Sequence, residues 1–427
     1  MSSFSDDPPV HPNADQGREP HLVPGRMGAR LYSLAALRER IEERFFEEYD
    51  ESPMLREADT SAKRLRLVLD VANYVFAVES VLVSEDEKAD LLRQAYSNLF
   101  GYGPLDALFL DERITTIAIN GADHAAVRYG HGDLQPLKPL FDDSEHLRRI
   151  VERLLIDAGT ELRDDLPAIE TGLRLGDRKA SLNVVMPPYS PVMNVDIRLH
   201  PPTMADMRRL VASGFMTDEA AALIHAIARS NHGIVIVGES EAGKTTLLSA
   251  AAAMLPETDD AVAVERAGEA QLPEAFERLT VRWALGDQTG VSFGEQIETA
   301  IAGRPSCIVL DEVRSDESMA IAPLLEAEFS ARQIWVVRGV PDAKRLQSAL
   351  GMLARRSNPD RGEAPVHALY ERLPFVLTTA RIQGQLKLFS IAEWQPSAAS
   401  DYPDYVMLMQ YREGAARPTG NPPFRRI

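Results

Sequence analysis

A glycine-rich stretch, "GESEAGKTT" at residues 238–246, has the residue types of a phosphate-binding loop. It follows the apolar run "GIVIVG" and precedes the helical run "KTTLLSAAAAML", and this strand–loop–helix context gives the pattern G-x-x-x-x-G-K-T a chemical meaning. Its glycines let the backbone curl so that N–H groups face inward, where the helix N-terminus adds positive charge. We therefore expect a nucleotide to bind at Gly238, Glu239, Ser240, Glu241, Ala242, Gly243, Lys244, Thr245 and Thr246. The alternative is a structural turn.

Two side chains of this stretch have defined chemical tasks. The Lys244 ammonium supplies a charge between the β- and γ-phosphates, and the Thr245 hydroxyl can complete a Mg²⁺ shell. Glu239 and Glu241 do not exclude a phosphate, because the loop holds phosphate through its backbone. Together, with only two glycines left, they predict a weaker affinity.

A second candidate element is "CIVLDEVR" at residues 307–314. Four apolar residues that lead into a carboxylate pair predict a buried strand whose C-terminal end opens at the phosphate site. Asp311 would hold Mg²⁺ through water, and Glu312 would polarise the attacking water. The alternative is a strand that ends in a solvated acidic turn.

The elements that must position these residues are short, β-branched apolar runs between helical stretches. "GIVIVG", "DAVAVE", "PSCIVLDEV" and "RQIWVVRG" predict the buried strands of an α/β core. Thr217 is the expected N-cap of the helix that precedes the first of them. We place this P-loop domain at residues 215–395 and a C-terminal tail at 396–427.

The N-terminal half has a different pattern. Residues 1–28, rich in Pro, Ser, Asp and Gly, predict a disordered tail. Residues 29–99 predict helices, one of them capped by Thr60 or Ser61. Residues 100–200 mix helix and strand signals around a turn at Asn120–Gly121, which indicates a small α+β domain. A linker is expected at 201–214, where two prolines follow each other.

Composition narrows the class of protein. A net charge of −18 argues against a broad surface that neutralises phosphates, so no direct contact with nucleic acid is expected. The single cysteine, Cys307, excludes an internal disulfide and a cysteine-based metal cluster. The sequence has no run of about 18 apolar residues and no signal-peptide pattern, so we expect a soluble, cytoplasmic protein.

The order of these elements resembles the ATPases of type II and type IV secretion and pilus machines, nearest to the Tad-pilus and conjugation-associated branch. The resemblance runs from about residue 100 to about residue 395. It includes "GYGPLDALFLDERITTIAING", "RKASLNVVMPP" followed by "DIRL", and "AIAGRPSCIVLDEVR".

The resemblance implies an α/β fold in which a smaller α+β N-terminal domain precedes a RecA-like P-loop ATPase domain, in a ring of six subunits. It implies ATP and Mg²⁺ as ligands, and an inner-membrane platform as partner, so that the protein would associate peripherally with the inner face of the cell membrane. Arginines of the N-terminal domain would reach the phosphates: Arg198 first, then Arg178, with Arg174 expected in a surface salt bridge. Glu265 and Glu269 fall on the acidic box of the family, which orders water and metal near the γ-phosphate.

The sequence departs from the family around this one site. Arg266 stands where the family has Asp, and Asp311 where it has Gly. The stretch "RQIWVVRGVPDA" matches the histidine box but has no histidine, and Val336 takes the histidine's place in our alignment. These departures predict slower or altered hydrolysis. One hypothesis is an active hexameric ATPase that drives export or pilus assembly, and another is a nucleotide-binding ring subunit with weak catalysis. An unrelated P-loop kinase or nucleic-acid motor fits the N-terminal pattern poorly.

Overall fold

The computed structural model describes residues 22–23, 32–50, 52–163, 165–201, 206–256 and 260–427. The chain divides into two compact units. The first consists of Met1–Glu112, Gly121–Ala125 and Pro136–Leu154, and the second of Arg113–Asn120, Ala126–Gln135 and Leu155–Ile427. Most of the predicted 1–28 tail and part of the predicted linker lie outside the described residues, so these two predictions stay predictions.

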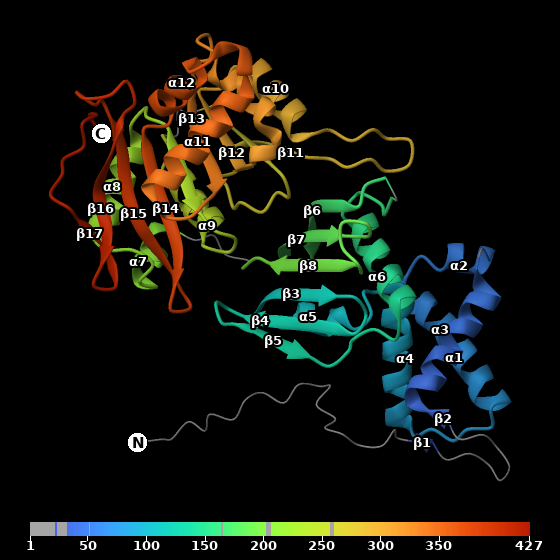
Figure 1. The fold of residues 1–427 in the computed structure, drawn as a ribbon. Coiled ribbons are helices and arrows are strands. Elements are labelled where there is room, and N and C mark those ends of the chain that lie inside the picture. The colour runs from blue at the N-terminus through green and yellow to red at the C-terminus, as the bar shows by residue number, and fades with distance from the viewer. Residues whose placement is uncertain (1–21, 24–31, 51, 164, 202–205, 257–259) are drawn as a thin grey trace, which may run out of the picture. The chain divides into compact units, whose positions relative to one another are not determined.

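The first unit is helical (Figure 1). Helices α1, α3 and α4 pack around a core that includes Phe45, Val71 and Ala95. The predicted cap at Thr60 is present, since its hydroxyl accepts a hydrogen bond from the N–H of Lys63 at 3.3 Å. The elements are β1 (Leu22–Val23), β2 (Tyr32–Ser33), α1 (Leu34–Tyr49), α2 (Pro53–Glu57), α3 (Ser61–Val78), α4 (Glu85–Phe100), α5 (Leu105–Leu110) and α6 (Ser144–Asp157), whose last residues enter the second unit.

A six-stranded sheet, here called the small sheet, follows in the sequence. Its strand order is β5-β4-β3-β8-β7-β6, and β3–β8, β8–β7 and β7–β6 are antiparallel pairs. The predicted turn lies between β3 and β4, where Gly121 has a φ of 65°. The strands are β3 (Ile114–Asn120), β4 (His124–Tyr129), β5 (Leu134–Leu137), β6 (Ala168–Leu175), β7 (Arg178–Val185) and β8 (Asn194–Leu199).

A nine-stranded sheet, here called the large sheet, has the order β11-β10-β12-β13-β9-β14-β15-β16-β17. It is parallel from β11 to β14 and antiparallel from β14 to β17. Its strands are β9 (Ile234–Gly238), β10 (Ala261–Glu265), β11 (Glu277–Thr280), β12 (Cys307–Val313), β13 (Arg332–Arg338), β14 (Phe375–Ile382), β15 (Gln385–Gln395), β16 (Asp404–Arg412) and β17 (Ala415–Pro418). The four predicted strands of the core are β9, β10, β12 and β13.

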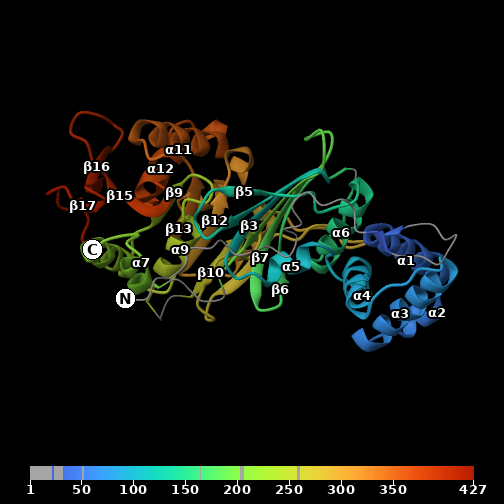
Figure 2. The same ribbon diagram turned by 90° about the horizontal axis from the view of Figure 1, so that it is seen from below.

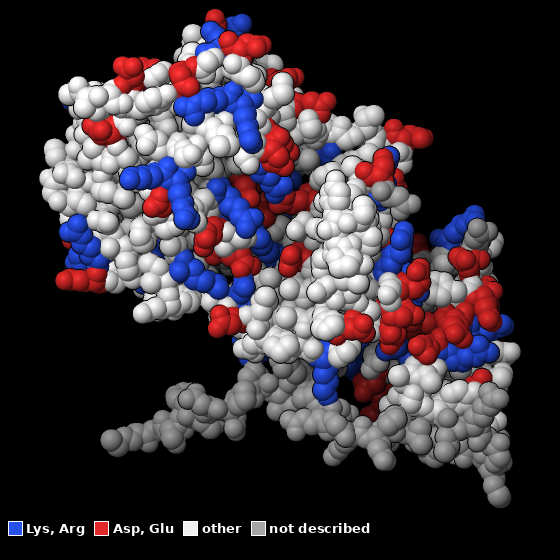
Figure 3. Space-filling model, viewed as in Figure 1, with Lys and Arg blue, Asp and Glu red and all other residues white. Residues whose placement is uncertain are grey.

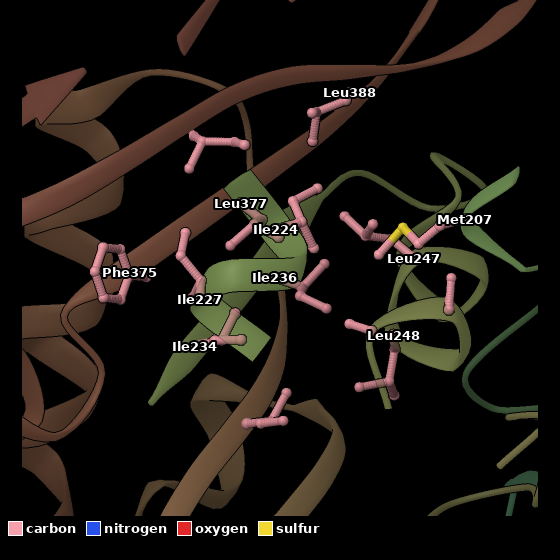
Figure 4. Packing of buried hydrophobic residues seen from close by; sticks show 14 of the residues in the cluster. Met207, Ile224, Ile227, Ile234, Ile236, Leu247, Leu248, Phe375, Leu377 and Leu388 are labelled. Atoms are coloured by element: carbon pink, nitrogen blue, oxygen red, sulfur yellow. The ribbon is translucent and has the colours of Figure 1, made fainter. Parts of the chain in front are cut away.

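Helices cover both faces of the large sheet, which explains why a central strand such as β9 is buried at every position. On β9, Ile234 and Ile236 face one layer, and Val235 and Val237 face the other. Figure 4 shows the first layer, where α8 and α9 pack on β9 and β14. In Figure 2, α11 and α12 lie on the opposite side of the sheet from α7 and α9. The helices are α7 (Met207–Ala212), α8 (Asp218–Arg229), α9 (Lys244–Ala252), α10 (Phe293–Ala302), α11 (Ala343–Ser357) and α12 (Ala364–Arg372), with the 3₁₀ segments η1 (Ser315–Leu325) and η2 (Pro359–Arg361).

The strand order places β13 between β9, which leads into the glycine-rich loop, and β12, which ends in the acidic pair. One strand between these two elements is the arrangement of RecA-like P-loop domains, as predicted. None of the described helices is long and apolar enough to cross a membrane.

The segment predicted as a C-terminal tail instead contributes two strands to the large sheet. β16 pairs with β15 and β17 with β16, so the sheet extends well past residue 395. The sequence signal was weak because these strands are only partly buried, and a single apolar segment, "DYVMLMQYR", marks them.

A buried carboxylate anchors the last residues to this part of the sheet. Glu393 on β15 is fully buried. It accepts hydrogen bonds from the backbone N–H groups of Phe424 at 2.7 Å and Arg425 at 3.0 Å. The Arg425 guanidinium donates to the same carboxylate at 3.1 Å and to the Trp394 carbonyl at 2.6 Å. Because a buried charge needs such partners, this contact fixes the chain end.

Replacement of Arg425 by alanine should therefore destabilise the fold while it leaves the two backbone donors in place. A hydrogen bond to a buried charged group is worth about 1.5–3 kcal/mol, and 1 kcal/mol shifts the Tm of a domain of 150–250 residues by about 2–4 °C. We expect a Tm lower by several degrees in a thermal unfolding experiment. Arg426→Ala, at an exposed neighbouring position, is the matched control. Equal Tm values for Arg425→Ala and wild type would contradict the assignment.

Candidate functional site

The loop after β9 requires both of its glycines. A Cβ atom at Gly238 would lie 2.4 Å from the Thr379 hydroxyl oxygen and 2.9 Å from the Thr379 carbonyl oxygen. Gly243 has a φ of 86° and begins α9, and a Cβ atom there would lie 3.2 Å from the Phe215 ring. The backbone can therefore turn from strand to helix in the tight curve that phosphate binding needs.

Lys244 is the first residue of α9 and is 6% exposed. Its ammonium donates a hydrogen bond to the carbonyl oxygen of Glu239 at 2.8 Å, within the loop. Burial lowers the pKa of Lys244, and the charge of Glu312 acts against this shift. A phosphate oxygen could replace the Glu239 carbonyl as acceptor with little movement of the backbone. Thr245 and Thr246 follow on the first turn of α9 and are partly buried.

Glu241 connects the loop to the small sheet, within the second unit. It has a φ of 57°, in the left-handed region that non-glycine residues rarely adopt. Its carboxylate forms an ion pair with Arg128 on β4 and accepts a hydrogen bond from the Thr116 hydroxyl at 3.3 Å. Burial alone would raise the pKa of Glu241, but the hydrogen bond and charge of Arg128 outweigh it and lower the pKa. The carboxylate is therefore held by charge rather than left uncompensated.

Among the predicted arginines, Arg198 reaches the loop. From β8, its guanidinium donates to the Ser240 hydroxyl at 2.9 Å and lies 3.9 Å from the Glu241 carboxylate. Arg178 does not line the site: its guanidinium donates to the carbonyl of Ile114 at 2.7 Å, inside the small sheet. Arg174 donates to the carbonyl of Gly176 at 3.3 Å, in the turn between β6 and β7.

The acidic pair lies at the end of β12, where the register to β13 shifts between Leu310 and Val313. Glu312 in this bulge has a φ of 50°, a second strained backbone position. Asp311 is 6% exposed. Burial raises the pKa of Asp311 well above its usual range, and the charges of Glu269, Glu265, Glu312 and Glu170 raise it further. A cation beside Asp311 would relieve this repulsion.

This environment fits Mg²⁺. The described residues contain no group of three or more His, Cys, Asp or Glu side chains arranged to hold a metal ion. Mg²⁺ is typically bound by one or two carboxylates, with water and substrate phosphates completing its shell. Thr245 is the candidate to bind Mg²⁺ directly, and Asp311 is the candidate to hold it through water. Glu269 is a neighbouring carboxylate whose oxygen lies 3.8 Å from His200 Nε2.

The predicted acidic box has a more structural role than the sequence indicated. Glu265 is 1% exposed, and its two oxygens accept from the N–H of Ala270 at 3.1 Å and from Arg278 Nε at 2.6 Å. Burial raises the pKa of Glu265, with Arg278 acting against this shift. Glu265 is not among the residues that line the cavity described below. It holds the 265–270 segment in place, and a direct catalytic role for it stays a prediction.

Arg266, which replaces the family's Asp, supports Glu312. Its Nε donates to the backbone carbonyl of Glu312 at 3.0 Å. The same guanidinium forms an ion pair with Glu317 and lies over the Phe293 ring, 4.4 Å from the centroid. Arg266 thus fixes the strained backbone that carries the Glu312 carboxylate.

A cavity of about 610 Å³ opens between these groups, all of which belong to the second unit. Ser240 of the loop, Arg198, Glu269, Glu312 and Arg338 line it. A smaller cavity of about 370 Å³ is lined by Glu239, Ser240, Arg338, Gly339 and Val340. On the face shown in Figure 3, basic and acidic side chains are interspersed, and no continuous basic surface is visible there. The lining of the larger cavity likewise carries both signs of charge, with five arginines and six carboxylate residues.

The structure shows which residue of the stretch matched to the histidine box reaches the cavity. Val336 is fully buried and belongs to the same core layer as Ile234 and Ile236, so its side chain does not reach the cavity. Arg338, two residues later, is exposed at the end of β13 and lines both cavities. The residue at the site on this strand is therefore an arginine, because Arg338 is the last residue of β13 and the one residue of that strand that is not buried.

Sequence reasoning missed three further arginines at this site: Arg128, Arg266 as a support, and Arg314, which lines the larger cavity and forms an ion pair with Glu170. A sequence signal existed for Arg338, since its apolar strand ends in Arg-Gly much as the acidic strand ends in Asp-Glu, and Arg266 and Arg314 lie in or beside stretches that the sequence analysis had already singled out. Arg128 gave no such signal, because its partner lies 113 residues away in the sequence.

The fold and the site define a P-loop nucleotide-binding protein with a RecA-like ATPase domain. Residues 121–327 match the family described as "Type II/IV secretion system protein". Two Mycobacterium tuberculosis proteins, from strains CDC 1551 and H37Rv, are described as candidate conjugal transfer proteins. Each is 30% identical over 242 residues, which cover 55% of this chain and 68% of the relative. The chain belongs to the family of type II and type IV secretion system ATPases.

Solved structures of this family are more distant. The ATPase DotB of Legionella pneumophila is 16% identical, with a TM-score of 0.46, and the match covers 74% of this chain and 81% of DotB. The VirB11 ATPase of the Brucella suis type IV secretion system is also 16% identical, with a TM-score of 0.34, and the match covers 70% of this chain and 97% of VirB11. The family assignment rests on the sequence matches.

The left-handed backbone conformation at Glu241 should lower the stability of the fold. Glu241→Gly and Glu241→Ala both remove the carboxylate, but only glycine relieves the left-handed φ, which costs a non-glycine residue about 1 kcal/mol. We expect Glu241→Gly to unfold at a temperature about 2–4 °C higher than Glu241→Ala.

The matched pair is Glu239→Gly and Glu239→Ala in the same loop, where φ is not in the left-handed region. At residue 239 the order of the two unfolding temperatures should reverse, because glycine has more conformational freedom to lose on folding. The same order at both positions would show that Glu241 is not strained.

Proposed function

We propose that this protein is a ring-forming ATPase of a type II or type IV secretion, Tad-pilus or conjugation machine, and that ATP binding and hydrolysis in a hexamer drive pilus assembly or substrate export. The proposal is supported above all by one cavity in which Ser240 of the loop, Arg198 of the small sheet and Glu312 of the acidic strand meet. These are the phosphate-binding, charge-neutralising and water-activating groups that such a reaction needs.

Each group has a defined task in this proposal. The loop N–H groups and Lys244 hold the phosphates, and Arg198 offsets charge that develops on them. Bound Mg²⁺ supplies charge neutralisation between the phosphate oxygens. In this proposal Asp311 accepts that ion, and Glu312 orients and deprotonates the attacking water.

The family assignment supports the proposal of a ring, its partners and its location. We propose a homohexamer on the inner face of the cell membrane, in contact with an inner-membrane platform of the machine. In such a ring, nucleotide-dependent movement of the small sheet against the ATPase domain would be passed to the platform. The Glu241–Arg128 ion pair is a candidate link for this coupling, because it joins the loop to the small sheet.

A second function, a nucleotide-binding ring subunit with weak catalysis, is favoured by one specific observation. Arg266 stands where the family has an acidic residue, and its guanidinium is bound to the Glu312 backbone and to Glu317. The acidic box therefore has one carboxylate fewer to order water and metal. Such a subunit would bind ATP and act through a hydrolysing partner.

Lys244→Ala should abolish measurable nucleotide binding. The ammonium is the only side-chain charge that the loop supplies to the phosphates, and losing a charge-assisted hydrogen bond worth about 3 kcal/mol lowers affinity about 100-fold. Titration calorimetry with Mg²⁺-ADP measures the affinity for nucleotide. Lys344→Ala, at an exposed position on α11, is the matched control and should bind as wild type does. Wild-type affinity in Lys244→Ala would remove the basis of the proposed function.

Glu312→Gln should keep ATP binding and lose turnover by about 10²–10⁴-fold, the usual contribution of a general base. The measurement is steady-state Mg²⁺-ATP hydrolysis at several protein concentrations, with Lys244→Ala as blank and Glu298→Gln on the exposed face of α10 as control.

Turnover per subunit that rises with concentration supports the ring. Tight binding without turnover in the wild-type protein favours the weakly catalytic subunit. If Glu312→Gln turns over as fast as the wild type, another group activates the water.

A further inference from the structure

Arg338 lies at a fixed position beside the phosphate loop. It is the last residue of β13, the strand between the loop strand β9 and the acidic strand β12. In the ladder of β13 and β9 its partner is Gly238, the first glycine of the loop. The next residue, Gly339, donates its N–H to the Gly238 carbonyl at 3.1 Å. The Arg338 backbone is therefore held against the loop, while its side chain extends beyond the end of the sheet.

The Arg338 guanidinium is exposed and forms no hydrogen bond or ion pair with any residue that the structure describes. It lines both cavities next to the loop, and Ser240 is the loop residue that lines both with it. The charge of Arg338 also acts on the loop lysine. Burial is the main cause of the lowered pKa of Lys244, and Arg338 is one of the cations that lower this pKa further.

The other arginines around the larger cavity differ from Arg338. Arg198, Arg266 and Arg314 are bound to Ser240, Glu317 and Glu170, respectively. Arg282 is also exposed, but it lies in the segment between β11 and α10 and not on a strand beside the loop. Arg338 thus combines a rigid backbone next to the loop with a guanidinium whose donors are free within the described part of the chain.

We propose that Arg338 binds the terminal phosphate of a bound nucleoside triphosphate. The proposal rests on the proposed function and deepens it. The guanidinium lines the cavity that also holds Glu312, the candidate for activating water at the terminal phosphate, which places it on that side of the loop. Its planar donors match phosphate oxygens in pairs, which an ammonium does not. A diphosphate has no group at that place, so Arg338 distinguishes ATP from ADP.

The test is titration calorimetry with the full chain, Mg²⁺ and two ligands, ADP and the slowly hydrolysed analogue ATPγS. We expect Arg338→Ala to lose about 10-fold or more in ATPγS affinity, the effect of one charge-assisted contact, and to keep ADP affinity within about twofold. Arg338→Lys should recover only part of the ATPγS affinity, because lysine keeps the charge but not the paired donors. Arg356→Ala, an exposed arginine on α11, is the matched control.

The ratio of the two affinities separates this role from a structural one. An Arg338→Ala variant that loses ADP and ATPγS affinity equally would overturn the inference, since misfolding or loop damage affects both ligands. Unchanged ATPγS affinity would also overturn it, and would leave nucleotide binding itself intact. If the wild-type protein binds neither ligand, the proposed function fails, and the inference about Arg338 fails with it.

Discussion

The site depends on one close approach, that of Gly238 to Thr379 on the neighbouring strand β14. A side chain at residue 238 would collide with both the hydroxyl and the carbonyl oxygen of Thr379. The collision could be relieved only by moving β9 or β14, and β9 is fully buried between β13 and β14. Because packed interiors transmit such displacements, the position of the loop is set by the core and not by the loop itself. The end of β13, and therefore Arg338, is fixed by the same ladder.

Charge is the second organising feature of the site. Three carboxylates at or near the cavity have an arginine partner: Glu241 has Arg128, Glu170 has Arg314 and Glu317 has Arg266. Asp311 differs, since nearby carboxylates raise its pKa and a cation that interacts with it is the loop lysine, Lys244, and not an arginine. The place where a cation would be most stabilised is therefore also the place where the acidic strand ends. Ion pairs of this kind hold a defined geometry more than they add stability, because desolvation offsets much of their Coulomb energy.

The features that could be predicted from the sequence are those that depend on neighbouring residues in the chain. The core strands were recognisable because each is short, β-branched and buried on both faces, and the loop because its pattern lies between a strand and a helix. The long-range partners were not predictable. Arg128 on β4 meets Glu241 although the two are 113 residues apart in the sequence, and Glu265 binds Arg278 because β10 and β11 are neighbouring strands. Whether Val336 or Arg338 reaches the cavity depends on the residue at which β13 ends, which the sequence does not reveal. The strands β16 and β17 were missed because they are partly exposed and have a weak apolar signal.

The anchoring of Glu393 has a consequence for synthesis of the chain. This carboxylate is fully buried on β15 and accepts a hydrogen bond from the nearby Gln395 side chain at 3.0 Å, but its other donors come from residues 31 and 32 positions later. While those residues are still inside the ribosome, a completed sheet would leave the buried carboxylate without the Arg425 guanidinium and two backbone donors, which is unfavourable. The antiparallel side of the large sheet therefore closes only after Phe424 and Arg425 have emerged. The phosphate loop strand and its neighbours, by contrast, can pair earlier, so the nucleotide-binding half of the domain is able to form before the sheet is complete.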